Sequence, residues 1–138
     1  MTVRAIQIGL HPDVVDYDSP EFARFPELSQ EKLQAAHDRN IAQLREWGYE
    51  VEGCQIDLGD TALDVVRQRF AEAHFDAVLI GAGVRLAASN TDLFEALVNL
   101  VHIELPHARF IFNRTAKATP EDIRRWFPHP HPDSAAIA

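Results

Sequence analysis

The chain has 138 residues, of which 46% are hydrophobic and 25% are charged, values typical of one globular domain with its own core. Its formal net charge of -8 disfavours a nucleic-acid or anionic-membrane partner, since both need a net basic face. The single cysteine, Cys54, excludes an intramolecular disulfide. No apolar run approaches the ~20 residues of a membrane helix, and the first residues are too polar for a signal peptide. We therefore expect a cytoplasmic location.

Residues 3–10, VRAIQIGL, are rich in valine and isoleucine and predict a first β-strand. Residues 11–28 are rich in proline and aspartate and lack a sustained helical period, so they predict a connection longer than the ~2–6 residues usual in α/β units. Ser29 is a good N-cap for the helix that follows, whose apolar residues recur at helical spacing as far as Trp47. Gly48 then stands where a glycine commonly ends a helix.

The rest of the chain continues to alternate between strand and helix patterns. Residues 75–82, FDAVLIGA, form a near-continuous apolar run that is typical of a parallel strand covered on both faces. Residues 128–138 predict a disordered tail after one domain of residues 1–127. The other predicted elements are a strand at 49–58, a helix at 62–73 capped by Asp60 or Thr61, a helix from Thr91 or Asp92 to Leu105, a strand at 108–113 and a helix at 120–127 capped by Thr119.

Four strands that alternate with helices predict an α/β fold, with a parallel sheet and helices on both faces, because crossovers between parallel strands are right-handed. We expect a single doubly wound domain, flavodoxin-like or Rossmann-like, with the strand order 2-1-3-4. In such sheets ligands bind at the carboxyl ends of the strands where the order reverses, here between strands one and three. This rule selects residues 9–13, GLHPD, and 80–85, IGAGVR, as the neighbours that form the site.

The turn after the third predicted strand combines backbone freedom with a cation. Gly81 and Gly83 allow a backbone to approach a ligand closely, and the forked guanidinium of Arg85 suits a carboxylate or phosphate. With a helix N-terminus nearby and Asn113 at the rim, this pattern predicts a site for a small anionic ligand. Alternatively, the glycines only shape a tight turn, Arg85 pairs with an aspartate of the 11–28 loop, and Asn113 belongs to a polar turn.

The sequence carries no recognisable cofactor motif. A dinucleotide fingerprint requires a third glycine where Leu86 stands, and the phosphate loop that ends in Gly-Lys-Ser/Thr is absent. The seven histidines show no spacing typical of a metal site, and Cys54 lies in phase with Ile56 and Leu58, as a buried core residue would. We therefore expect no cofactor and no metal.

His11 is the one histidine at a predicted strand end near the point where the strand order reverses. An imidazole is the side chain best suited to act as a general acid or base, and Asp13 lies within reach of the same crevice. His11 and Asp13 are therefore the candidate catalytic residues. Alternatively, His11 is a loop residue that hydrogen-bonds the backbone next to Pro12.

The helix that reads TDLFEALVNLVHIEL carries more apolar surface than one side of a sheet requires. An apolar surplus of this kind marks an interface, and a two-fold homodimer is the commonest arrangement. We expect Leu97, Val98 and Val101 to lie in that interface. Alternatively, a neighbouring helix and the long loop cover this surface within one chain.

The segment FDAVLIGAGVR followed by LFEALVNLVHIELPHARFIFN, together with the HPDVVDY loop, resembles a group of short, largely uncharacterised α/β proteins. The resemblance spans most of residues 3–127. It implies a Rossmann-like fold and carries no activity to this chain. The matching positions are Pro12, Asp13, Asp16, Gly81, Gly83, Arg85, Asn99, His102 and Asn113.

Three functions fit these observations. The leading interpretation is a module that binds a small anionic metabolite at the carboxyl ends of strands one and three through Arg85. The first alternative is a small hydrolase or lyase that acts on a phosphorylated or carboxylated substrate, with His11 or Asp13 moving the proton. The second alternative is a structural subunit whose function is its homo-oligomeric interface.

Overall fold

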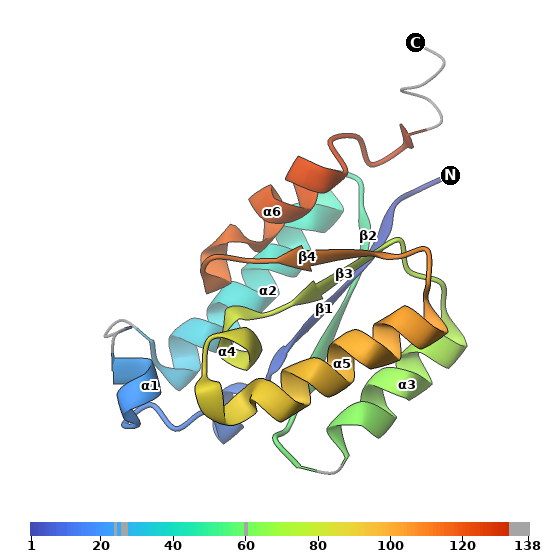
Figure 1. Ribbon diagram of the computed structural model, residues 1–138. Helices are drawn as coiled ribbons and strands as arrows, with labels where there is room; N and C mark the ends of the chain where they lie inside the picture. The colour runs from blue at the N-terminus through green and yellow to red at the C-terminus, as the bar shows by residue number, and fades with distance from the viewer. Residues whose placement is uncertain (24, 26–27, 60, 133–138) are drawn as a thin grey trace.

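The structure, a computed structural model, describes residues 1–23, 25, 28–59 and 61–132. One parallel sheet runs through the molecule in the order β2-β1-β3-β4 (Figure 1). The predicted α/β class and the strand order 2-1-3-4 are confirmed, so the domain is flavodoxin-like. The strands are β1 (Arg4–Leu10), β2 (Glu50–Ile56), β3 (Ala77–Ile80) and β4 (Arg109–Phe112).

Helices cover both faces of the sheet (Figure 1). Helices α2 (Gln30–Glu46) and α6 (Thr119–Trp126) lie on one face, and α3 (Ala62–Glu72) and α5 (Thr91–Glu104) lie on the other. None of the helices within the described part of the chain combines the length and the apolar character that crossing a membrane requires. The short helical segments are η1 (Pro12–Val14), α1 (Pro20–Ala23), α4 (Ala82–Arg85), η2 (Ala88–Asn90) and η3 (Ala116–Ala118).

The alternation of side chains along β1 divides the core into two layers. Ile6 and Ile8 point to the layer under α3 and α5, whereas Val3 and Ala5 point to the layer under α2 and α6. Because successive inward residues lie two apart, the next residue on the α2 face is Gln7, which is only 5% exposed. The α2 layer therefore changes from apolar to polar near the carboxyl end of β1.

Local signals place most helix ends where the sequence predicts them. The Ser29 hydroxyl accepts a hydrogen bond from the Lys32 amide at 3.2 Å, and Gly48 takes the positive φ of +99° that follows many helices. The prediction that Thr119 caps the last helix is wrong. Thr119 is the first residue of α6, and its hydroxyl accepts a hydrogen bond from Asn113 instead of capping the helix. A predicted cap at Asp60 falls outside the described residues, as does the 133–138 part of the tail predicted to be disordered at 128–138. Residues 128–132 are described, and the Pro130 carbonyl accepts a hydrogen bond from the Val3 amide at 2.8 Å.

The apolar surplus of α5 is mostly covered within the chain. Leu97 and Val101 are fully buried against the sheet and α3, so their assignment to an intermolecular interface is wrong. Val98 is partly buried against the same core. Phe94 extends toward the edge of the sheet and meets Phe112 edge-to-face, with ring centroids 5.9 Å apart.

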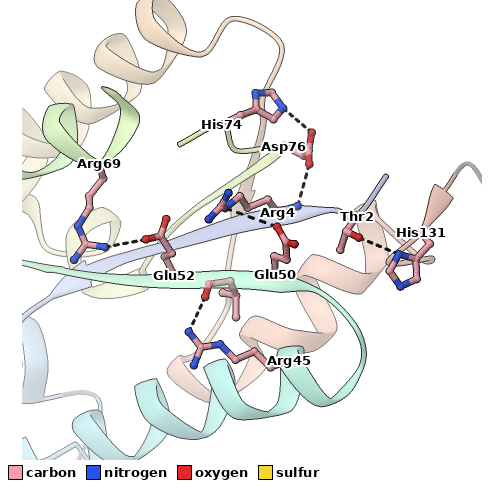
Figure 2. Close-up of polar contacts among 10 residues, drawn as sticks. Thr2, Arg4, Arg45, Glu50, Glu52, Arg69, His74, Asp76 and His131 are labelled. Atoms are coloured by element: carbon pink, nitrogen blue, oxygen red, sulfur yellow. Dashed lines mark hydrogen bonds and ion pairs between the residues drawn. The ribbon is translucent and has the colours of Figure 1, made fainter. Parts of the chain in front are cut away.

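The two edge strands of the sheet, β2 and β4, differ in the side chains that lie beside their outward backbone groups. On β2, the amide of Glu50 bonds to β1, so alternation turns the carbonyls of Val51 and Gly53 outward. Arg45 donates to Val51 O at 3.0 Å, and Arg69 donates to Gly53 O at 3.3 Å while contacting Glu52. Figure 2 shows Arg45 and Arg69 reaching β2 from helices on opposite faces. Charged side chains therefore obstruct strand addition at β2.

At β4 the outer edge is aromatic. The Arg109 amide bonds to Asp76 of the neighbouring chain segment, so alternation turns the backbone groups of Phe110 and Phe112 outward. The two rings stack with centroids 6.1 Å apart, and Phe112 is 39% exposed. Trp126, on α6, is 48% exposed near the same edge and lies beside Arg109.

Candidate functional site

A cavity of about 170 Å³ lies at the carboxyl ends of β1 and β3. Gly9 and Leu10 of β1 and the turn Gly81–Gly83 after β3 line it, so it occupies the position where the strand order reverses. The main-chain contact between the two segments is close: the Gly81 amide donates to Ile8 O at 2.8 Å. A Cβ on Gly81 would meet that same carbonyl at 3.4 Å, an ordinary van der Waals contact, so steric room alone does not require a glycine there.

The floor of the cavity is built from neutral amides. Gln7 is the last residue of β1 with a side chain in the α2-face phase, since Gly9 follows it, and Gln55 is the last such residue of β2. Asn113 follows Ile111 of β4 in the same phase. Asn40 joins them from α2, on the buried side of that helix between Ala36 and Leu44. We call Gln7, Asn40, Gln55 and Asn113 the amide cluster.

Gln7, His37 and Asn40 form a hydrogen-bond chain inside the cluster. Gln7 Nε2 donates to His37 Nδ1 at 2.6 Å, which places the ring proton of neutral His37 on Nε2. Asn40 Nδ2 donates to Gln7 Oε1 at 3.3 Å and to the Ala116 carbonyl at 2.7 Å. Burial lowers the pKa of His37, with His11 acting in the same direction and Asp38 opposing it, so the imidazole is neutral at pH 7.

Gly53 makes room for this chain. A Cβ at that position would overlap the His37 ring and come within 2.7 Å of Ile41 Cδ1. The glycine in β2 therefore lets His37 pack directly on the strand, where it accepts the bond from Gln7.

The part of the lining that the long connection after β1 supplies is mostly apolar, and we call it the roof of the cavity. Two aromatic side chains, Phe22 and Phe25, line it together with aliphatic residues of the same connection and of α2. Among the described residues, the charged side chains in the lining are Glu21 and the exposed Arg114. Glu21 accepts from the amide and the hydroxyl of Ser89 at 3.2 and 2.8 Å. The cavity thus pairs an amide floor with an apolar roof.

Arg85 binds the ends of two strands. Its guanidinium donates to Ile80 O at 2.9 Å and to Asn113 O at 2.7 Å, and it lies 5.1 Å from the centroid of Phe112. Burial lowers the pKa of Arg85, and Asp122 offsets part of that effect. The side chain therefore joins β3 to β4. The sequence predicts that Arg85 contacts an anionic ligand or, alternatively, pairs with an aspartate of the 11–28 loop. Either contact would require the Arg85 side chain to point in a different direction.

Asn113 connects the turn after β3 to the start of α6. Its Oδ1 accepts from the Ala82 amide at 2.8 Å and from Arg85 at 3.4 Å, and its Nδ2 donates to Thr119 at 3.0 Å. The structure therefore brings together four of the predicted ligand-binding residues, Gly81, Gly83, Arg85 and Asn113. Of these, all except Arg85 line the cavity.

His11 and Asp13 lie outside this cavity. His11 Nδ1 accepts from the Asp13 amide at 3.1 Å, so the imidazole caps η1, as the alternative interpretation of a backbone-bonded loop histidine predicts. The Asp13 carboxylate accepts from the side chain of Gln30. Both residues line a separate surface depression beside the N-terminus of α2.

Sequence reasoning missed Gln7, His37, Asn40 and Gln55, although a signal was present. Gln7 follows Val3 and Ala5 in the inward phase of a strand, and a polar residue at such a position must find partners or line a cavity. Cys54, by contrast, is buried as predicted, and burial raises the pKa of its thiol.

Within the part of the chain that the structure describes, no group of three or more His, Cys, Asp or Glu side chains is arranged to hold a metal ion. Searches against protein-family models and against curated proteins find no significant match to this chain. The resemblance carried by the GAGVR turn therefore stays an expectation.

Proposed function

We propose that the chain is a small-molecule binding module whose ligand occupies the cavity between the amide cluster and the roof at Phe22 and Phe25. The observation that carries the proposal is the polar floor itself. Gln7 and Asn40 are only 5% and 4% exposed, yet they stand at core positions where an aliphatic residue would pack without polar partners. A mostly apolar concavity with a few convergent polar groups is the usual form of a ligand site.

An anionic group on the ligand would bind at the rim. Arg85 is engaged with two strand-end carbonyls, whereas Arg114 lines the cavity and its side chain is exposed. The proposed ligand is therefore a small metabolite whose anionic group, where it has one, contacts Arg114 and whose remaining atoms enter the cavity. The cytoplasm remains the compartment we propose, because Cys54 is a free thiol.

Proton–nitrogen correlation spectra recorded with a panel of neutral heterocycles, sugars, carboxylates and phosphates test this proposal. At least one class is expected to shift the backbone amides of Gly81 and Gly83 and the side-chain amide of Gln7. Gly48, at the other end of the sheet, serves as the internal control that does not move. A panel that leaves all cavity signals in place at millimolar concentration would refute ligand binding at this site.

A second candidate function, a homodimeric subunit, is favoured by the difference between the sheet edges. In an antiparallel pairing of two β4 strands, Phe110 of each copy would lie opposite Phe112 of the other, and both outward backbone rows would be bonded. Arginines donate to the outward carbonyls of β2, whereas no side-chain hydrogen bond among the described residues reaches the outward carbonyls of Phe110 and Phe112. We propose this edge, in place of the buried Leu97 and Val101, as the dimer surface.

Sedimentation equilibrium of the wild type and of Phe112→Lys tests the dimer. The wild type is expected to sediment as a dimer and Phe112→Lys as a monomer, because a lysine at a strand edge opposes pairing. Leu58→Lys is the matched control, since Leu58 is 49% exposed but lies away from β4. A monomeric wild type at all concentrations would exclude this function.

A further inference from the structure

The amide cluster has hydrogen-bonding capacity that the chain leaves unused. Asn40 commits its Nδ2 to Gln7 and Ala116, and no hydrogen bond among the described residues uses its Oδ1. Gln7 Nε2 gives one proton to His37, and its second amide proton has no acceptor in the described part of the chain. Since Asn40 Nδ2 bonds to Gln7 Oε1 and both residues line the cavity, the unused acceptor and the unused donor belong to two adjoining amides of the lining.

The character of these two groups defines what complements them. The carbonyl of Asn40 accepts and the amide of Gln7 donates, so the matching ligand edge presents an N–H beside a C=O. A planar –CO–NH– group carries both the donor and the acceptor that complement them. Both protein groups are neutral and buried, and a charge placed against them would be desolvated without a counterion.

The volume sets the size of the part that enters. A cavity of about 150 Å³ in another protein accepts benzene, so the 170 Å³ here accommodates roughly one six-membered ring with a few substituent atoms. Phe22 and Phe25 in the roof favour a flat ring, because aromatic side chains stack on planar π-systems. The volume of the cavity, its aromatic side chains and its unused hydrogen-bonding groups thus all favour a flat, single-ring ligand that presents an N–H beside a C=O.

We infer that the cavity binds a small uncharged heterocycle through a lactam edge, with its ring N–H donating to Asn40 Oδ1 and its ring carbonyl accepting from Gln7 Nε2. This inference rests on the proposed binding function and names the ligand class of the same site. Asn40 and Gln7 are then the residues that determine specificity. An anionic substituent, if present, projects toward Arg114 at the rim.

Titration of the wild type with three probes tests the ligand class, with chemical-shift changes at the cavity amides as the readout. The probes are uracil, which carries the lactam edge, 1,3-dimethyluracil, which keeps the ring and carbonyls but lacks N–H groups, and benzoate, which carries only a ring and a charge. Uracil is expected to bind at least about tenfold more tightly than either control, since a buried polar group left unpaired costs about that factor.

Two variants with matched chemistry locate the contact. Asn40→Leu is expected to weaken uracil binding by at least about tenfold. Asn90→Leu is the control, because Asn90 is also buried and also donates to a loop carbonyl, Gly83 O at 3.1 Å, but does not line the cavity. Should Asn40→Leu fail to fold, the comparison of uracil with 1,3-dimethyluracil on the wild type decides the question.

The outcomes separate the ligand class from the binding function. Equal affinity for uracil and 1,3-dimethyluracil, or undiminished uracil binding by Asn40→Leu, overturns the lactam assignment. Shifts at the cavity amides with benzoate alone also overturn it while leaving the binding function intact. If neither these probes nor the broader panel moves the cavity signals, the binding function itself fails.

Discussion

The amide cluster has two parts, one around Asn113 and one around Asn40, which we call the Asn113 cluster and the Asn40 cluster. The two parts differ in the hydrogen-bonding groups that they leave unbonded. Around Asn113, both side-chain groups and the backbone carbonyl are bonded within the chain, to Ala82, Arg85 and Thr119. Around Asn40, an amide proton of Gln7 and the Oδ1 of Asn40 remain available to a ligand. The comparison teaches that the residue pattern most suggestive of binding can have a structural role, whereas polar residues at core positions form the surface at which we propose that a ligand binds.

Removing Arg85 is expected to have the largest effect on stability. Arg85→Met deletes the hydrogen bonds to Ile80 O and Asn113 O that join β3 to β4. Losing these partly buried bonds lowers the free energy of unfolding by about 2–4 kcal/mol, measured by urea denaturation. The folded variant retains its ligand affinity, because Arg85 does not line the cavity. If Arg85→Met is as stable as the wild type but no longer binds ligand, then Arg85 has a binding role and not the structural role assigned to it.

The Asn40 cluster is sensitive to a single methyl group on the strand beneath it. Gly53→Ala places a Cβ against the His37 ring and Ile41, and this overpacking is expected to cost about 1–3 kcal/mol. Introducing the same change into a His37→Ala background should cost measurably less, since the imidazole is no longer there to be displaced. Additive effects in this double-mutant cycle, measured by urea denaturation, would show that Gly53 does not position His37.

His37 gives the Asn40 cluster a pH dependence that the Asn113 cluster lacks. Its pKa is lowered in the folded state below the ordinary 6.5, so the unfolded chain binds the proton more readily. The stabilising contribution of neutral His37 is therefore complete above about pH 6.5 and is lost as the pH falls through the folded-state pKa. Thermal unfolding between pH 5 and 8 should show this loss in the wild type and a flatter profile in His37→Gln. Identical profiles would mean that another group titrates.

The smallest effect is expected at the predicted catalytic residue. His11→Ala removes the cap on η1, which costs about 1 kcal/mol or less at this partly exposed position. Ligand affinity at the cavity should be unchanged in the same titrations that test Asn40→Leu, because His11 lines a different depression. If His11→Ala loses ligand binding, His11 takes part in the binding site after all.

Patterns that depend on neighbours in the chain were predictable. The apolar run of β3, the Ser29 cap and Gly48 depend on local dihedral angles and on the period of the strand or helix, and each lies where the sequence places it. The strand order followed from connection rules, and the location of the cavity followed from the strand order. Roles that depend on long-range geometry were less predictable: Arg85 faces strand-end carbonyls, and Leu97 and Val101 face the core.

The sequence by itself determined the alternation of strands and helices, the parallel sheet and the edge at which a ligand site would lie. These follow from hydrophobic period and chirality, which act within a few tens of residues. The tertiary structure alone decided which polar groups remain free at that edge. Gln7, Asn40 and Ala116 are far apart in the chain, and only folding shows that their mutual bonds use Asn40 Nδ2 and involve no bond to Asn40 Oδ1 among the described residues.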